Sequence, residues 1–248
     1  MKNLSIIIVC TLLSLFQLKG QEHHPCWEFK INGGFNTGGT LPIPLSVEIR
    51  KIESYRPSPF APHVALEVIR WFNKKWGVST QITLDYKGFK VKDRVKNLHT
   101  EIEMADEKYI GNFTGKNETR INNSYITVPV MANYRFSDKW TAQLGLYIGY
   151  LYNSGFKGTA SDGYIRRGSP IGEKTIVDNA AFDFSENMNK FDFGLQIAGE
   201  WEFHHNFGLR GQITWGTKPI FPADFTAVSF DMYNIYGMLG LSYRLKTK

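Results

Sequence analysis

The sequence predicts an all-β protein, an eight-stranded antiparallel up-and-down transmembrane β-barrel with four long extracellular loops and three short periplasmic turns. Three observations lead to this fold class. Eight segments alternate apolar and polar residues with a period of two, and their apolar faces carry many of the six Trp and eighteen Phe residues. Very short and very long connections alternate between these segments, which is the pattern of barrels in the bacterial outer membrane.

The first twenty residues have the pattern of a secretory signal peptide. Lys2 supplies a positive charge, an apolar run extends from Leu4 to Leu18, and cleavage is expected after Gly20. This run is short for a membrane-spanning helix, which needs about 20 apolar residues. We therefore expect a cleaved signal peptide at residues 1–20 and one outer-membrane β-barrel domain at residues 21–248.

The mature chain has a weak positive charge and one cysteine. Without Lys2 and Lys19 it has 27 basic and 23 acidic residues, a net charge of +4 that is spread along the chain. Such a dispersed charge gives no case for nucleic-acid binding. Cys26 is the only cysteine left, so no intrachain disulfide is possible.

Each predicted strand has one apolar and one polar face. Successive side chains of a strand point to opposite faces, so each segment can cross a membrane with its apolar side toward lipid. The segments have roughly the 9 to 12 residues that a tilted strand requires. In chain order their outward residues include Trp27, Phe29 and Ile31; Val64, Leu66 and Val68; Val78, Ile82 and Leu84; Ile126, Val128 and Val130; Leu144, Leu146 and Ile148; Phe191, Phe193 and Leu195; Leu209, Ile213 and Trp215; and Leu239, Leu241 and Tyr243.

The inward faces of the strands are charged. Eight strands leave an interior just wide enough for side chains, and an unpaired buried ion costs several kcal/mol. We therefore expect these charges to pair and to fill the lumen as a plug. This lumen charge network comprises Glu28, Lys30, Glu67, Asp85, Lys87, Arg135, Asp192, Glu200, Glu202, Arg210 and Arg244.

The connections predict the orientation of the barrel. Tight turns are expected at 73–75, 137–139 and 204–206, whereas the segments near 37–62, 88–123, 153–189 and 217–233 read as long loops. Short turns face the periplasm in outer-membrane barrels, so both chain termini are expected there. A periplasmic aromatic girdle would lie at the same end and comprise Trp27, Phe72, Trp76, Phe136, Trp140, Phe203, Phe207 and Tyr243.

Two residues break the pattern of their strands. Pro129 lacks the N–H that a barrel strand needs, which predicts a β-bulge or a strand end at this position. Arg70 has lipid-facing parity but lies three residues from the turn at Asn73, so we expect its side chain to reach the periplasmic headgroups.

A lipocalin-like barrel or a sandwich would also have strands of period two. Either would place the apolar face inside, where a small barrel has no room for this many aromatic rings.

A metal site at His23, His24 and Cys26 is disfavoured because Pro25 interrupts a very short run of ligands. A hydrolase built on Ser58, His63 and Glu67 has no distinctive spacing, so no catalytic, cofactor or metal site is expected.

The run Tyr125-Ile126-Thr127-Val128-Pro129-Val130 is followed by Asn133-Tyr134-Arg135-Phe136 and, after a turn, by Leu144-Gly145-Leu146-Tyr147-Ile148-Gly149-Tyr150-Leu151. These residues resemble the PorT-type outer-membrane β-barrel family common in Bacteroidetes. The junction after Gly20 and the closing Ser242-Tyr243-Arg244-Leu245 are similar to that family as well. The resemblance implies the barrel fold and an outer-membrane location, but no secretion or gliding role, because many members share only the fold. The chain departs from the usual pattern by ending in Lys246-Thr247-Lys248.

The expected function is a binding, structural or assembly-associated role without catalysis. Connections longer than about 12–15 residues are usually functional or disordered, so a protein partner is expected at 37–62 or 153–189. Outer-membrane lipid and lipopolysaccharide are the expected surroundings of the barrel. The alternatives are a small passive porin, which planar-bilayer conductance would reveal, and, less favoured, an outer-membrane hydrolase.

Overall fold

The computed structural model describes residues 26–104, 107–169 and 171–245. The expected signal peptide at residues 1–20 and the residues His23 and His24 lie outside this part of the chain. Within it there is no helix that is long and apolar enough to cross a membrane.

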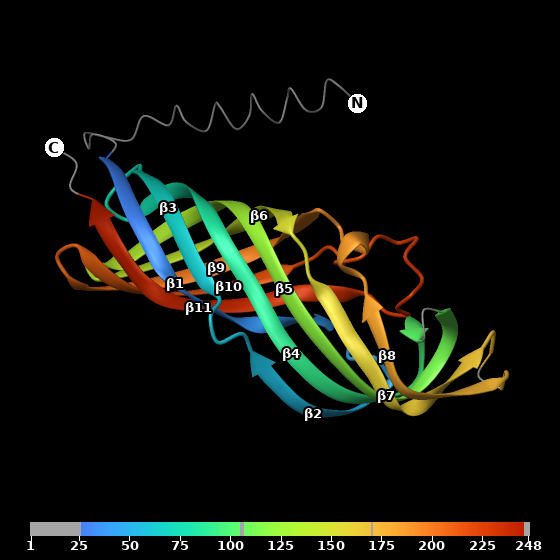
Figure 1. The fold of residues 1–248 in the computed structure, drawn as a ribbon. Helices are drawn as coiled ribbons and strands as arrows, with labels where there is room; N and C mark the ends of the chain where they lie inside the picture. Colours follow the sequence, from blue (N-terminus) through green and yellow to red (C-terminus); the bar gives the residue numbers. More distant parts are fainter. Residues whose placement is uncertain (1–25, 105–106, 170, 246–248) are drawn as a thin grey trace, which may run out of the picture.

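In this described part, the chain forms eleven antiparallel strands and one short 3-10 helix (Figure 1). They are β1 (Cys26–Pro42), β2 (Ile49–Pro57), β3 (Pro62–Trp71), β4 (Trp76–Met104), β5 (Glu107–Ser137), β6 (Trp140–Asn153), β7 (Phe156–Arg167), β8 (Lys174–Asp183), η2 (Ser185–Asn187), β9 (Phe191–His204), β10 (Phe207–Gly216) and β11 (Met232–Leu245). The pairing order β1-β3-β4-β5-β6-β9-β10-β11 returns to β1 and closes a barrel.

The other three strands lie outside this closed circuit. β2 pairs with β4, β7 pairs with β5, β8 pairs with β7, and a bridge between Glu103 and Ala181 brings β8 back to β4. Together with the far halves of β4 and β5 they form a projection, which we call the extension. It lies at the opposite end from the start of β1 and the close of β11, where the three short turns are found (Figure 1).

The expected strand count and long loops therefore need correction. The described residues form eleven strands rather than eight, and much of 37–62, 88–123 and 153–189 is regular strand. β4 has 29 residues and β5 has 31, far more than the expected 9 to 12. The segment 217–233 does form a loop before β11, and its backbone bonds to the rest of the fold through a bridge between Thr100 and Val228.

The sequence of β4 explains why the extension was not predicted from the pattern of lipid-facing strands. Within the barrel its buried face is polar, with Asp85 and Lys87, and its other face is apolar. Beyond Gly88 the alternation continues, but the chemistry of the two faces is exchanged. The buried face then becomes largely apolar, beginning with Phe89, while the other face carries Lys90, Lys92, Arg94 and Lys96. This exchange marks the end of the apolar belt and the start of a water-facing structure with its own core.

Two apolar clusters fill the space above the lumen and inside the extension. The first contains Phe184 and Met188, which flank η2, and residues of the loop before β11, so both segments fold over the mouth of the barrel. The second lies among β4, β5, β7 and β8 and includes Leu98, Ile102, Phe113, Ile165 and Val177. The mouth of the barrel is therefore covered by apolar side chains rather than by open loops.

The outward faces of the barrel remain apolar and exposed. Seven of the eight residues proposed for the aromatic girdle are exposed, and Tyr243 is partly buried. The indole rings of Trp140 and Trp201 stack with their centroids 6.1 Å apart. The Arg70 guanidinium lies 5.3 Å from the ring centroid of Trp27, its partner across β1 and β3 at the turn end.

The prediction for Pro129 was wrong. β5 continues through this residue, and the ladder with β6 pairs Pro129 with Tyr147 without a shift of register. On the other side, the pairs with β4 pass directly from Thr80–Val130 to Thr83–Thr127 while the register is kept. The β4–β5 ladder is therefore interrupted beside Pro129, which accommodates the missing N–H of the proline. At this point the Thr80 hydroxyl donates to the Pro129 carbonyl oxygen at 2.7 Å.

Candidate functional site

The lumen contains a group of ion pairs around Lys30. Its Nζ lies 2.6 Å from Glu200 Oε1, 3.1 Å from Glu28 Oε1 and 3.7 Å from Glu202 Oε1. β1 and β9 supply these residues from opposite parts of the sequence. Lys30 and Glu200 are almost completely buried, so each charge depends on its neighbours rather than on water.

Arg210 extends this group toward β3 and β6. Its Nη1 lies 3.3 Å from Glu67 Oε2 and 3.6 Å from Glu200 Oε2, and its Nη2 donates to Gln143 Oε1 at 2.6 Å. Arg135 and Arg244 bind Glu28 from the turn end, at 3.3 Å and 3.0 Å. The connected group contains four acids and four bases: Glu28, Glu67, Glu200, Glu202, Lys30, Arg135, Arg210 and Arg244.

The other three charges predicted for the lumen lie apart from this group. Asp85 accepts from Asn36 and lies 2.6 Å from His63 Nδ1, while Asp192 accepts from Tyr147 and Asn234, both at 3.0 Å. Among the described residues no ion pair is found for Lys87 or Asp192. The Lys87 ammonium instead lies 4.9 to 5.6 Å from three ring centroids, those of Tyr125, Tyr147 and Tyr236.

The hydrolase residues are not brought together. Ser58 Oγ donates to the carbonyl oxygen of Phe60, His63 is fully buried against Asp85, and Glu67 belongs to the ion-pair group. Cys26 is a free, exposed thiol at the start of β1. In the parts of the chain that the structure describes, no three His, Cys, Asp or Glu residues form a cluster that could hold a metal ion.

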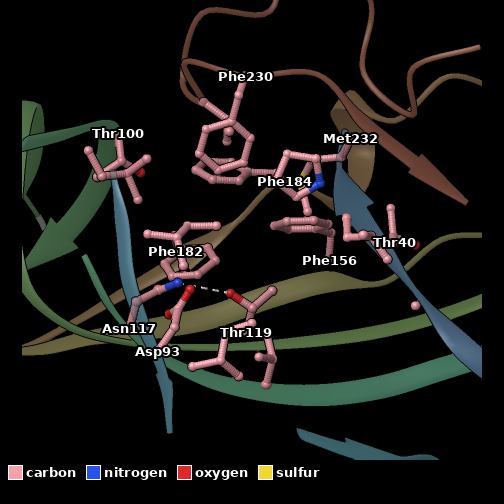
Figure 2. Close-up of a pocket in the computed structure, with 18 of the residues that line it drawn as sticks. Thr40, Asp93, Thr100, Asn117, Thr119, Phe156, Phe182, Phe184, Phe230 and Met232 are labelled. Atoms are coloured by element: carbon pink, nitrogen blue, oxygen red, sulfur yellow. Dashed lines mark hydrogen bonds between the residues drawn. The ribbon is translucent and has the colours of Figure 1, made fainter. Parts of the chain in front are cut away.

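An apolar cavity of about 260 Å³ lies inside the extension, between the two apolar clusters (Figure 2). Its walls come from β1, β2, β4, β5, β7 and β8, from the start of β11 and from the loop before β11. The lining residues include Leu41, Ile52, Tyr55, Phe89, Asp93, Leu98, Ile102, Phe113, Asn117, Thr119, Phe156, Ala160, Phe182, Phe184, Phe230 and Met232. A concave apolar site with a few polar groups is the usual form of a small-molecule site.

Asp93 is the only acidic residue in this lining. It occupies the buried face of β4 beyond the exchange of faces, is 7% exposed, and its Oδ1 has no hydrogen-bond partner within the described structure. Burial, with a smaller contribution from the nearby charge of Glu53, raises the pKa of the Asp93 carboxyl to about 6, although a hydrogen bond from Asn117 acts in the opposite direction. Beside it the Asn117 amide donates to Thr119 Oγ1 at 3.2 Å (Figure 2).

The sequence interpretation missed this cavity because it treated 88–123 and 153–189 as loops. The sequence of β4 did contain an indication of it. The inward positions at Asp85 and Lys87 are followed at the same spacing of two by Phe89, Val91, Asp93 and Val95, and no turn sequence ends the strand between them. One acid in an otherwise apolar run of buried positions is the mark of a special site.

The model of the outer membrane protein beta-barrel domain family matches residues 20–221. Among solved structures, Ail, the attachment invasion locus protein of Yersinia pestis, in complex with the heparin analogue sucrose octasulfate, is 14% identical with a TM-score of 0.39. That match covers 90% of this chain and 100% of the other. Neisserial surface protein A is 8% identical with a TM-score of 0.33, over 91% of this chain and all of the other. An outer membrane channel of Pseudomonas putida F1 is 7% identical with a TM-score of 0.27, over 92% and 98% of the two chains. No curated protein matches the chain.

Proposed function

The chain belongs to the outer membrane protein beta-barrel domain family, and we propose that it acts in the outer membrane as a binding protein without catalytic activity. The cavity of the extension is the observation that carries this proposal. It combines an apolar wall with one polar group and lies beyond the apolar belt of the barrel, where a ligand from the surroundings of the cell has access. The proposed ligand is a small apolar molecule.

The contents of the lumen favour binding over passive transport. Ion-paired side chains occupy the interior, and apolar residues that flank η2 or lie in the loop before β11 cover the mouth. A passive porin needs a continuous water-filled path. The PorT-type resemblance and a protein partner at 37–62 or 153–189 remain part of the proposal, now with strands β2, β7 and β8 as the contact surface.

Binding can be tested with 1-fluoronaphthalene on protein in lipid nanodiscs, because the ¹⁹F chemical shift separates protein-bound from lipid-dissolved probe. We expect saturable binding that Ala160→Leu abolishes, since Ala160 is buried against the cavity and the larger side chain fills part of it. Ser161→Leu is the matched control, because the neighbouring residue of β7 does not line the cavity. Equal binding by both variants, with both folded by circular dichroism, would contradict the cavity as the site.

We propose that the extension is extracellular and that both chain termini are periplasmic, in line with the short turns at their end. The free thiol of Cys26 provides a test. A membrane-impermeant maleimide should leave Cys26 unlabelled in intact cells and label it after the outer membrane is permeabilised. In a Cys26→Ser background, Ile171→Cys in the exposed turn between β7 and β8 should be labelled in intact cells. The reverse pattern would invert the proposed orientation.

A further inference from the structure

Asp93 presents a carboxylate to the cavity without a counter-ion. The two cations beside it on β4 lie on the opposite face of the strand and are engaged elsewhere. Lys92 Nζ lies 2.7 Å from Glu118 Oε2, and Arg94 Nε lies 2.6 Å from Glu53 Oε1. Among the described residues, no ion pair involves Asp93. A buried charge is normally paired, so this carboxylate is a candidate site for a cation from outside the described residues.

The groups that face Asp93 offer it hydrogen bonding but no positive charge. Its register partners are Ile52 on β2 and Asn117 on β5. The Asn117 amide donates to Thr119 Oγ1, and its hydrogen bonding to the Asp93 carboxyl lowers the pKa of that group, while Oδ1 remains without a partner. Tyr55 is the other titratable side chain in the lining, and its hydroxyl donates to the Gly38 carbonyl oxygen at 2.5 Å. The cavity therefore has one unsatisfied acceptor with a negative charge at neutral pH, and no cation opposite it.

The size of the cavity limits the rest of the ligand. An apolar cavity of about 150 Å³ binds one benzene molecule. In proportion, about 260 Å³ accommodates an apolar group of roughly ten carbons. Phenylalanine rings at Phe89, Phe113, Phe156 and Phe182 line much of the wall, which suits a flat aromatic or a short alkyl group.

We infer that the cavity binds an apolar primary amine of roughly ten carbons, with the ammonium group against Asp93 and the hydrocarbon among the phenylalanine rings. This inference rests on the proposed function and names its ligand class. An ammonium donates a charge-assisted hydrogen bond to the free Oδ1, whereas a neutral alcohol donates only an ordinary one. A carboxylate ligand would place two negative charges together in an apolar space. The cavity thus selects the amine by charge as well as by shape.

The experiment compares 1-naphthylmethylamine with its neutral analogue 1-naphthalenemethanol on protein in nanodiscs of uncharged lipid at pH 8. We expect the amine to bind about tenfold more tightly than the alcohol, the ratio that one charge-assisted hydrogen bond provides. Asp93→Asn should remove this preference and leave alcohol binding nearly unchanged, which also shows that the variant is folded. The preference should also fall as the pH is lowered through about 6, where Asp93 gains a proton.

Glu53→Gln is the matched control, because it removes a nearby exposed acid whose carboxylate binds Arg94 rather than the cavity. It should retain the preference for the amine. Equal affinities of amine and alcohol for the wild-type protein would overturn the amine inference and leave the apolar site intact. Failure of both naphthyl probes and of 1-fluoronaphthalene to bind would contradict the proposed function itself.

Discussion

Arg210→Met should lower the free energy of unfolding by about 3–5 kcal/mol, the range for breaking a buried ion pair by removal of one partner. Arg210 is nearly inaccessible to solvent and lies within 3.6 Å of carboxylate oxygens of both Glu67 and Glu200. Methionine preserves much of the volume but leaves one uncompensated negative charge in the lumen. Urea unfolding in detergent micelles, followed by tryptophan fluorescence, measures the loss.

A second substitution separates charge imbalance from packing. Arg210→Met combined with Glu67→Gln restores the neutrality of the ion-pair group and should recover most of the lost stability. Lys51→Met is the control, because Lys51 is exposed on β2 and such surface changes stay within about 0.5 kcal/mol. A loss below about 1 kcal/mol for the single variant would show that water or relaxation compensates the charge.

Asp93→Asn should stabilise the extension by up to about 3 kcal/mol at pH 8, and the gain should vanish below about pH 4. The pKa of Asp93 in the folded protein is about 6, above its ordinary value of 3.8. Between these two values the folded chain keeps a proton that the unfolded chain has lost. The free energy of unfolding therefore decreases as the pH rises through this window, and the full penalty is present above pH 6.

Hydrogen exchange of the β4 and β5 amides, compared between variant and wild type at each pH, measures this effect within the extension. Asp178→Asn on β8 is the control, since Asp178 is exposed and its replacement should leave the exchange unchanged at every pH. A constant difference between Asp93→Asn and wild type from pH 4 to pH 8 would show that the titration of Asp93 is not its source.

The barrel could be predicted from the sequence because lipid imposes one rule on all of its strands. Residues such as Leu144 and Leu146 must be apolar when they face lipid, and this gives a strict period of two. The extension obeys a different rule, because its outer face contacts water. On β5 the outward residues Ile126 and Val128 belong to the barrel, whereas Glu118 and Arg120 on the same face belong to the extension. A search for apolar outer faces therefore stops at the membrane boundary.

The candidate site depends on contacts that no local pattern contains. Asp93 and Ala160 are far apart in the chain, and the cavity between them exists only because β8 returns to β4 and Val228 pairs with Thr100. The sequence alone also could not assign partners within the lumen. Lys87 was expected among ion pairs, and the structure places it among tyrosine rings instead.

The exchange of faces along β4 bears on how the protein reaches its membrane. In the proposed orientation the whole extension has to be translocated across the bilayer during assembly, including Lys90, Lys92, Arg94 and Lys96 on the outer face of one strand. An Arg or Lys on the lipid side at the bilayer midplane costs about 2–4 kcal/mol, so four such residues passing together form a high kinetic barrier. Because β4 and β5 are paired almost continuously from Trp76–Tyr134 to Met104–Glu107, the hairpin carries these cations between its tip and the barrel. In the proposed orientation we therefore expect the chain to insert only slowly into a protein-free bilayer.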